Sequence, residues 1–408
     1  MRGVQRVLNA RLNGAVRIQI RLLGRALPAF QVCGGIGFAL AMPVALILAW
    51  RAGLSEWIVL ALALCGAFTF LALAMAVKIF TGVERLVYYH HEIAVVAVSA
   101  LLLRVLHLPV LAYLDITVLG LGLFLGFGRI GCFMVGCCHG KPSDWGVHYT
   151  REHADAGFPE CYVGVCLLPV QLLESLWVLG VTLAGVRMIW SATQPGEVFA
   201  WYLAAYSVGR FAFEFLRGDA ERLYAWGFSE AQWTSLVLMC GMAAAGPVVP
   251  MFGRWHLAIA VCMAVAMAGL AVARRLDRSR LDRLFHPSHL QEMSKIVRQI
   301  AALDRHPVSS VRIGRTSLGV HISASVHGAP SSLTQHYGIS LPVKTLGDRT
   351  ALALAGKVAQ LVCARAGASE LIRSDSGVFH LLIPYKGDRT ETDRRFKGRR
   401  AVEGRYDA

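Results

Sequence analysis

The chain has 408 residues, of which 55% are hydrophobic and only 16% are charged. A soluble domain cannot bury that much apolar surface, so the composition excludes a water-soluble globular protein and indicates a polytopic membrane protein. The formal net charge is +15, with arginines concentrated in the first 25 residues and after residue 273. This pattern favours contact with anionic lipid head groups over nucleic-acid binding, because no basic patch is interleaved with aromatic residues.

Residues 1–29 form an arginine-rich segment ahead of the first apolar run. Polar residues interrupt it too often for it to contain the apolar core of a cleavable signal peptide. Its arginines suit a helix or strand that lies on a membrane surface; they are Arg2, Arg6, Arg11, Arg17, Arg21 and Arg25. We therefore expect a basic interfacial segment.

Runs with few or no charges follow, and each is close to the ~20 residues that a spanning helix needs, except the third, which is short. They cover residues 30–50, 57–77, 91–106, 114–134, 168–189, 198–216, 231–249 and 257–273. The sequence contains no internal or inverted repeat, which argues against a secondary transporter. We predict an all-α polytopic membrane bundle of seven or eight transmembrane helices over residues 30–273.

The character of the chain changes after residue 273, where a basic collar from Arg274 to Arg283 begins a more polar region. Two segments there have helical spacing and two alternate like strands; they are residues 290–303 and 351–365, then 319–326 and 378–385. We predict a small α+β soluble domain over residues 274–385, whose role the sequence does not reveal. The charged residues 386–408 have no apolar period, so we expect a disordered tail.

The fourth apolar run ends in an unusual stretch, GRIGCFMVGCCHG, at residues 128–140. An arginine in a membrane segment is costly, so Arg129 is expected to face a cavity or a partner. The glycines allow the backbone to approach a ligand or a neighbouring helix closely. The alternative is a helix-packing seam with an arginine that reaches the interface.

The sixth apolar run carries a polar stripe, formed by Tyr206, Arg210, Glu214 and Arg217. Spacings of four, four and three residues place these side chains on one face of a helix. A polar face on an apolar span indicates a hydrated or ligand-filled interior. The alternative is an Arg210–Glu214 pair that satisfies only itself and a neighbouring helix.

A third polar group stands at the start of the fifth run, in the stretch LPVQLLE at residues 168–174. Pro169 suits the first turn of a helix, where its missing N–H costs nothing. Gln171 and Glu174 are three residues apart, so they share a face and point toward the same cavity. Glu174 has two interpretations, a catalytic role or a structural ion pair with an arginine such as Arg129.

These three stretches resemble motifs of the prolipoprotein diacylglyceryl transferase family, in the family's order and over residues 30–249. The first is similar to Gly-Arg-(Ile/Leu)-Gly-Asn-Phe-x-Asn-Gly-Glu-x-x-Gly, with Cys132, Val135 and Cys137 in place of the two asparagines and the glutamate. The other two are similar to Pro-x-Gln-Leu-Tyr-Glu and to Tyr-x-x-x-Arg-x-x-x-Glu-x-x-Arg. The departures indicate a divergent branch, and the resemblance does not extend to the C-terminal domain.

The resemblance implies an enzyme of lipoprotein biosynthesis in the bacterial inner membrane. Members of the family transfer a diacylglyceryl group from phosphatidylglycerol to the lipobox cysteine thiol of an exported preprotein, and glycerol phosphate is released. The partners implied are therefore phosphatidylglycerol, the preprotein and membrane lipids, with no nucleic acid, no metal and no other cofactor. Two alternatives stay open: the same scaffold acting on a different acceptor, or a non-enzymatic lipid-binding sensor.

The resemblance also assigns roles to individual residues. The family's catalytic histidine stands at the start of the third run, where this chain has YYHHE at residues 88–92, so His90 takes the position and His91 is the second choice. An interfacial belt of tyrosine and histidine is the alternative. The implied catalytic residues are His90, Tyr206, Arg210 and Glu214; those for phosphatidylglycerol are Arg129, Gly131, Gly136, Gly140, Gln171, Glu174 and Arg217.

Cysteines gather in and after the first motif, at Cys132, Cys137, Cys138, Cys161 and Cys166. One interpretation is a disulfide between the motif and the following loop on an oxidising face of the membrane. A second is a Cys/His metal site, although the spacing matches no standard zinc pattern. The third is that the thiols are small buried side chains that fill space.

Overall fold

The computed structural model describes residues 2–22, 24–82, 88–220, 222–276, 281–301, 311–327, 334–340, 348–362, 370–374 and 378–384. Contacts divide the chain into two compact units. The N-terminal unit consists of Met1–Lys141, Trp145–Phe158 and Leu167–Leu276, and the C-terminal unit of Pro142–Asp144, Pro159–Cys166 and Asp277–Ala408. The C-terminal unit thus includes two pieces of the loop between the fourth and fifth apolar runs.

The N-terminal unit begins with a helix and a short hairpin, in the segment expected to be interfacial. Helix α1 (Arg2–Ala15) exposes Val4, Val7 and Leu8 to the surroundings. Strands β1 (Gln19–Leu22) and β2 (Arg25–Pro28) pair antiparallel. Exposed apolar residues on a basic helix suit a segment that lies against lipid head groups.

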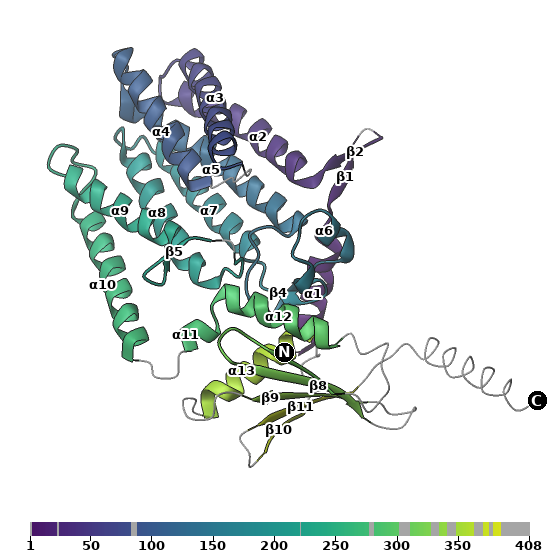
Figure 1. The fold of residues 1–408 in the computed structure, drawn as a ribbon. Coiled ribbons are helices and arrows are strands. Elements are labelled where there is room, and N and C mark those ends of the chain that lie inside the picture. The colour runs from purple at the N-terminus through teal and green to yellow at the C-terminus, as the bar shows by residue number, and fades with distance from the viewer. Residues whose placement is uncertain are drawn as a thin grey trace, which may run out of the picture. The chain divides into compact units, whose positions relative to one another are not determined.

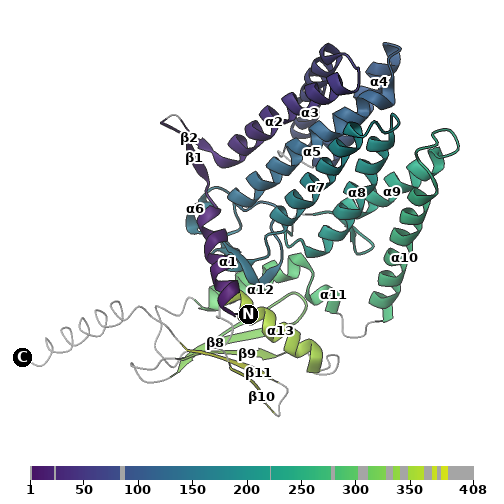
Figure 2. The same ribbon diagram turned by 180° about the vertical axis from the view of Figure 1, so that it is seen from behind.

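A row of long helices forms the body of this unit, as predicted. They are α2 (Ala29–Arg51), α3 (Glu56–Thr81), α4 (Tyr88–Val105), α5 (Val110–Val135), α7 (Val170–Trp190), α8 (Glu197–Phe213), α9 (Glu230–Ala245) and α10 (Arg254–Leu276). Figures 1 and 2 show α5 lying between α2 and α7 from both sides. Among the described residues, five of these helices are long and apolar enough to cross a membrane: α2, α3, α5, α7 and α10.

Most of the predicted boundaries differ from the structure by a few residues, and two of these differences affect the candidate site. The third helix begins at Tyr88, three residues before the predicted start, so the YYHHE stretch lies inside its first turns. The sixth run is not one continuous α-helix, because α8 ends at Phe213 and continues as a 3-10 turn over Glu214–Leu216. The tighter turn changes the angular spacing at the end of the polar stripe.

Close packing holds α5 in the centre of the row. A Cβ built on Gly126 would lie only 2.6 Å from Cδ2 of Leu179 in α7, and one on Gly122 would collide with Thr182. Small residues let helix backbones approach closely in a membrane, where water does not drive them together. A larger residue at Gly126 would therefore force the Leu179 side chain to move.

A buried carboxylate ties α5 to α8. Asp115, only 5% exposed, accepts hydrogen bonds from the backbone N–H groups of Gly196 and Phe199, both at 2.7 Å. These N–H groups belong to the N-terminal end of α8, where helix N–H groups have no partner within the helix. Asp115 thus satisfies them from a neighbouring helix, and the positive end of the helix dipole stabilises its charge.

The Asp115→Ala variant is expected to lose about 3 kcal/mol of stability, because each hydrogen bond to a charged group contributes about 1.5–3 kcal/mol. The midpoint of thermal unfolding in detergent should fall accordingly. Asp155→Ala is the control, because Asp155 forms only an exposed ion pair with Arg151. Equal midpoints for the two variants would contradict a capping role for Asp115.

The C-terminal unit contains a five-stranded antiparallel sheet with the order β10-β11-β9-β8-β7. The strands are β7 (Arg312–Arg315), β8 (His321–His327), β9 (Thr334–Ser340), β10 (Glu370–Arg373) and β11 (Phe379–Pro384). Helices α12 (Pro287–Ala301) and α13 (Asp348–Leu361) pack on one face of the sheet, and α11 (Leu281–Leu284) precedes them. The predicted helices and strands correspond to α12, α13, β8 and β11, so an α+β fold is confirmed for the described part.

Some elements of the C-terminal region were not predicted, and some predictions for it concern residues outside the described part. The sequence pattern missed β7, β9 and β10, which are short or mostly polar. Arg278, Arg280 and the tail at residues 386–408 lie outside the described residues.

Two loop pieces, Pro142–Asp144 and Pro159–Cys166, fold with the helices of the C-terminal unit. Ser294 of α12 donates a hydrogen bond to the Cys161 carbonyl at 2.7 Å. Lys357 of α13 donates to the Pro142 carbonyl at 2.7 Å. The loop also contains strands β3 (Pro142–His148) and β4 (Cys166–Leu167), the short helix α6 (Arg151–Asp155) and a 3-10 turn at Glu160–Tyr162.

Candidate functional site

A buried carboxylate, Glu174, holds three arginines in the interior of the N-terminal unit. Its Oε2 lies 2.8 Å from Nε of Arg129, and its Oε1 lies 2.9 Å from Nη1 of Arg210. Nη1 of Arg217 lies 3.8 Å from Oε1. The four side chains are all less than 10% exposed. Charges buried so deeply are stable only when they are paired, which explains why α5, α7 and α8 converge here.

Two more carboxylates and a fourth arginine extend this network. Glu214 pairs with Arg210 at 2.8 Å and with Arg222, while Asp219 binds Arg217 through two parallel contacts of 2.8 Å. Burial lowers the pKa of Arg222 to about 10, which still leaves it charged at neutral pH. The four arginines therefore exceed the three carboxylates, Glu174, Glu214 and Asp219, by one formal charge. Guanidinium groups in excess of their carboxylate partners within this network favour an anionic ligand.

Arg129 has donor groups that remain available to an anion. It contacts Glu174 through Nε alone, and within the described part of the chain its two Nη groups have no hydrogen-bond partner. Arg129 also lines a cavity of about 370 Å³ together with the other three arginines. We call this the arginine cavity; further lining residues are Phe30, Tyr88, Tyr89, Cys132, Cys138 and Glu230. A guanidinium with two unpaired nitrogens presents the donor pair that binds phosphate or carboxylate through parallel hydrogen bonds.

A second cavity, of about 320 Å³, lies among α2, α3, α4 and α5. Its lining is almost wholly apolar and includes Ala41, Leu62, Ala63, Val95 and Ile116. We call this the apolar cavity. It shares Phe70, Tyr88 and Phe124 with the arginine cavity, so the two spaces adjoin. A hydrocarbon chain fits this lining, because apolar side chains make up most of it, with His91 and Glu92 among the few polar members.

The two candidate histidines occupy different places. His90 pairs with Glu230 at 2.9 Å, and their side chains are 44% and 39% exposed. Glu230 lines the arginine cavity, whereas His90 is not among the described residues that line either space. His91 is buried against the ring of Phe70, with centroids 4.5 Å apart, and lines the apolar cavity. The placement therefore favours His90 over His91 for proton transfer at the arginine cavity.

The three glycines assigned to phosphatidylglycerol are not among the described residues that line either cavity. A Cβ on Gly131 would lie 3.1 Å from the Phe30 backbone, and one on Gly140 would lie 2.4 Å from the Leu168 carbonyl. Gly136 ends α5 in the left-handed region, with a φ of 87°. In this structure Gly131 and Gly140 permit close packing against neighbouring segments, and Gly136 allows α5 to end.

The other assigned residues lie around the ion pairs. Gln171 donates a hydrogen bond to the Cys137 carbonyl at 2.8 Å. The Tyr206 ring stacks on Tyr202 and meets Tyr89 edge-on. Glu174 and Glu214 hold the arginines in place. The structure therefore brings Arg129, Arg210 and Arg217 to the cavity and arranges Gln171, Tyr206 and the two glutamates behind them.

Sequence reasoning missed several residues at this site. Arg222 and Asp219 follow the polar stripe in a loop, where no helical period fixes their direction, although the charge-rich stretch RGDAER at residues 217–222 was visible. Glu92 is buried and accepts a hydrogen bond from the Tyr202 hydroxyl at 2.9 Å. A carboxylate four residues after Tyr88 in an apolar run was the signal that could have identified it.

The cysteines are divided between the two units. Cys132, Cys137 and Cys138 belong to the N-terminal unit, and their sulfur atoms all lie within 4.8 Å of one another. Cys161 and Cys166 belong to the C-terminal unit. Cys132, Cys137, Cys138 and Cys161 form no disulfide in the described structure, so the interpretation of a disulfide between the motif and Cys161 is not supported.

The fold and this site define a helical membrane protein in which an arginine-lined cavity adjoins an apolar one. The family model for prolipoprotein diacylglyceryl transferase matches residues 36–246, which is more than half of the chain. The chain therefore belongs to the prolipoprotein diacylglyceryl transferase family.

Individual relatives match a shorter part of the chain. It is 39% identical over 115 residues to the phosphatidylglycerol–prolipoprotein diacylglyceryl transferase of Clostridium tetani, covering 27% of this chain and 43% of the relative. It is 34% identical over 138 residues to transferase 2 of Clostridium perfringens, covering 32% and 50%. It is 33% identical over 143 residues to transferase 2 of Streptomyces coelicolor, covering 34% and 43%. The chain thus spans about half the length of these curated relatives.

Proposed function

We propose that this protein is an enzyme of the bacterial inner membrane that transfers diacylglyceryl from phosphatidylglycerol to a cysteine thiol of an exported preprotein. The observation that carries the proposal is the junction of the two cavities. The arginine cavity suits a phosphodiester with one negative charge, and the adjoining apolar cavity suits an acyl chain. The names of the curated relatives state this substrate and acceptor class.

In the proposed mechanism, the arginines stabilise the leaving group. Arg129 binds the phosphodiester through its two Nη groups, while Arg210 and Arg217 face the same cavity. When the carbon–oxygen bond breaks, glycerol phosphate leaves with a second developing negative charge. Fixed guanidinium groups in a buried site stabilise that charge more strongly than water does, because they need no reorganisation.

The attacking group is the acceptor thiol, which must lose its proton to become a nucleophilic thiolate. His90 is the proposed base, since its partner Glu230 lines the arginine cavity. A carboxylate bonded to histidine orients the ring and stabilises its protonated form. The thiolate sulfur then bonds to the glyceryl carbon as the carbon–oxygen bond to phosphate breaks.

Purified protein in vesicles with radiolabelled phosphatidylglycerol tests the activity. Label is expected on a lipobox peptide, but not on the same peptide with serine in place of the acceptor cysteine. Label on another thiol or an amine in place of the lipobox peptide would support the alternative acceptor. Complementation of a strain depleted of its own transferase provides the matching test in cells, and bound lipid without turnover would favour a sensor.

Filling the apolar cavity should change the lipid preference. Ala63→Phe adds a ring inside a space of about 320 Å³, so transfer from long-chain phosphatidylglycerol should fall at least about tenfold relative to a short-chain lipid. Ala61→Phe is the matched control, because Ala61 lies on the same helix with its side chain exposed. An unchanged ratio of the two lipids in Ala63→Phe would place the acyl chain elsewhere.

Hydrogen bonds within each unit support eight membrane spans. Asn9 and Asn13 of α1 accept hydrogen bonds from Gly146 and His148, so the N-terminus and the loop after α5 lie on one side. The same loop folds with α12 in the C-terminal unit. The N-terminus, the loop and α12 lie on the same side if the chain crosses the membrane an even number of times before the loop and an even number of times after it. Eight spans, α2–α5 and α7–α10, meet this condition.

We further propose that these three parts face the outer side, where exported preproteins arrive. The positive-inside rule would instead place the arginine-rich ends in the cytoplasm, although arginines that lie flat on lipid weaken that rule. Ser143→Cys and Leu352→Cys, each in a cysteine-free background, should react together with a membrane-impermeant reagent in intact spheroplasts. Reaction of both only after lysis would invert the bundle, and reaction of one alone would refute eight spans.

A further inference from the structure

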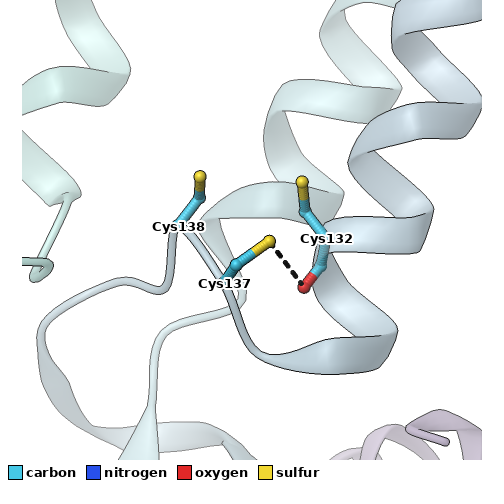
Figure 3. Close-up of side chains that lie close together, drawn as sticks. All are labelled: Cys132, Cys137 and Cys138. Carbon is cyan, nitrogen blue, oxygen red and sulfur yellow. Dashed lines mark hydrogen bonds between the residues drawn. The ribbon is translucent and has the colours of Figure 1, made fainter. Parts of the chain in front are cut away.

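Three sulfur atoms meet at the end of α5. The helix ends at Gly136, and Cys138 also adopts the left-handed region, with a φ of 57°. These two positions turn the chain so that Cys137 and Cys138 lie beside Cys132. Figure 3 shows the side chains of Cys132 and Cys138 pointing in the same direction, with the sulfur atom of Cys137 between them. A positive φ is uncommon for cysteine and is strained, so the surrounding structure maintains this turn at a cost.

The spacing of the sulfur atoms suits one thiophilic metal ion. All three lie within 4.8 Å of one another, and each is a free thiol. Tetrahedral zinc has zinc–sulfur bonds of about 2.3 Å, which place sulfur atoms about 3.8 Å apart. The sulfur atoms would therefore draw together by at most about 1 Å when zinc binds.

The surroundings suit a three-thiolate site with one open position. Cys132 and Cys138 line the arginine cavity, so a metal ion held by the three sulfurs would face that cavity. Zinc with three thiolates carries one net negative charge, which is costly to bury alone. Arg129 and Arg217 line the same cavity and would stabilise that charge.

We propose that Cys132, Cys137 and Cys138 bind one zinc ion and that its fourth position takes the acceptor thiol. The zinc site is inferred from the geometry of the three cysteines. The role of the fourth coordination position rests on the proposed function. Three protein ligands and one exchangeable position are the arrangement of catalytic zinc.

Zinc would activate the acceptor thiol by making it more acidic, because a thiol that binds zinc is held as the thiolate. The proton passes to His90, the proposed base. The zinc-bound sulfur forms a bond to the glyceryl carbon while the carbon–oxygen bond to phosphate breaks, and glycerol phosphate leaves with the electron pair. The thioether product is neutral, so it binds zinc weakly and is released.

Zinc binding is measured on the full-length protein, purified in detergent under reducing conditions without a histidine tag. After removal of metal by a chelator, zinc titration should give one ion per chain. The Cys137→Ser/Cys138→Ser double variant should bind at least about 100-fold more weakly. Cys240→Ser/Cys262→Ser is the matched control, because both cysteines are exposed on α9 and α10. Cadmium should give a thiolate charge-transfer band in the wild type and the control only.

Failure of the reduced wild type to bind zinc would overturn the metal site. Equal zinc affinity in the wild type and the Cys137→Ser/Cys138→Ser variant would also overturn it. Thermal unfolding of each variant checks that loss of zinc does not reflect loss of the fold. A disulfide among the three cysteines, found by mass spectrometry in protein that binds no zinc after reduction, would replace the metal site with a redox pair.

Activity separates the role of the metal from the proposed function. Transfer should fall at least tenfold when zinc is removed and return when zinc alone is added back. Full transfer by zinc-free protein would overturn the acceptor role and leave the proposed function intact. Zinc-loaded protein that transfers to no acceptor would refute the proposed function and leave the metal site intact.

Discussion

Arg129→Lys is expected to abolish transfer almost as completely as Arg129→Ala. Arg129 uses Nε to hold Glu174 and leaves two Nη groups for the phosphodiester. Lysine has a single nitrogen, so it cannot hold the carboxylate and also form two parallel bonds to phosphate. The turnover rate of both variants should fall at least about 100-fold, as for removal of a donor that stabilises a developing negative charge. Transfer of labelled lipid to the peptide measures this rate.

Arg187→Lys is the matched control for this prediction. Arg187 is exposed near the end of α7, so the exchange preserves the charge outside the cavity and should leave transfer unchanged. Membrane insertion and the midpoint of thermal unfolding show whether the Arg129 variants fold. Transfer by Arg129→Ala at the wild-type rate would remove Arg129 from the mechanism.

Arg210→Ala is expected to cause a loss at least as large. Nη1 of Arg210 lies between Glu174 and Glu214, at 2.9 and 2.8 Å, and the Glu214 side chain is fully buried. Without Arg210 the network loses its excess positive charge, so the cavity should no longer attract the anionic lipid. We expect transfer to fall about 1000-fold, with weaker binding of phosphatidylglycerol in a direct binding assay.

Phe211→Leu is the comparison for Arg210→Ala. Phe211 is the next residue on α8 and is a partly buried apolar side chain at the edge of the core, so its exchange to leucine should be mild. If the two variants behave alike in transfer and in lipid binding, the polar stripe has a structural role only. Arg210→Lys keeps one positive charge and should recover part of the lipid binding, which a purely steric role for Arg210 would not explain.

The sequence predicted the helices and the Arg210–Glu214 pair because both depend on local spacing, and these two residues are four apart. An ion pair between Glu174 and an arginine such as Arg129 was one of two interpretations of Glu174, and the structure contains that pair. Arg222 was missed because its direction depends on the loop after α8. The assigned glycines were matched by motif, but their effect depends on which neighbouring atoms approach them, and a pattern does not contain that information.

The cluster of three cysteine sulfurs also could not be predicted from the sequence. Their spacing in the sequence matches no standard zinc motif, because such motifs record hairpins and helices that recur in small zinc domains. Here the sulfur atoms meet through a helix end followed by a residue with positive φ. The left-handed backbone at Cys138 could not be predicted from its side chain, since cysteine rarely adopts it.

The loop pieces in the C-terminal unit impose an order on biosynthesis. Cys161 emerges from the ribosome 133 residues before its partner Ser294, and Asp144 emerges 216 residues before Gln360. At roughly 5–20 residues per second, the first delay alone is on the order of ten seconds. The loop therefore reaches its final packing only after the last helix of the bundle has been made. A chain truncated after α10 would retain its helices but would leave residues 159–166 without the partners that bury them.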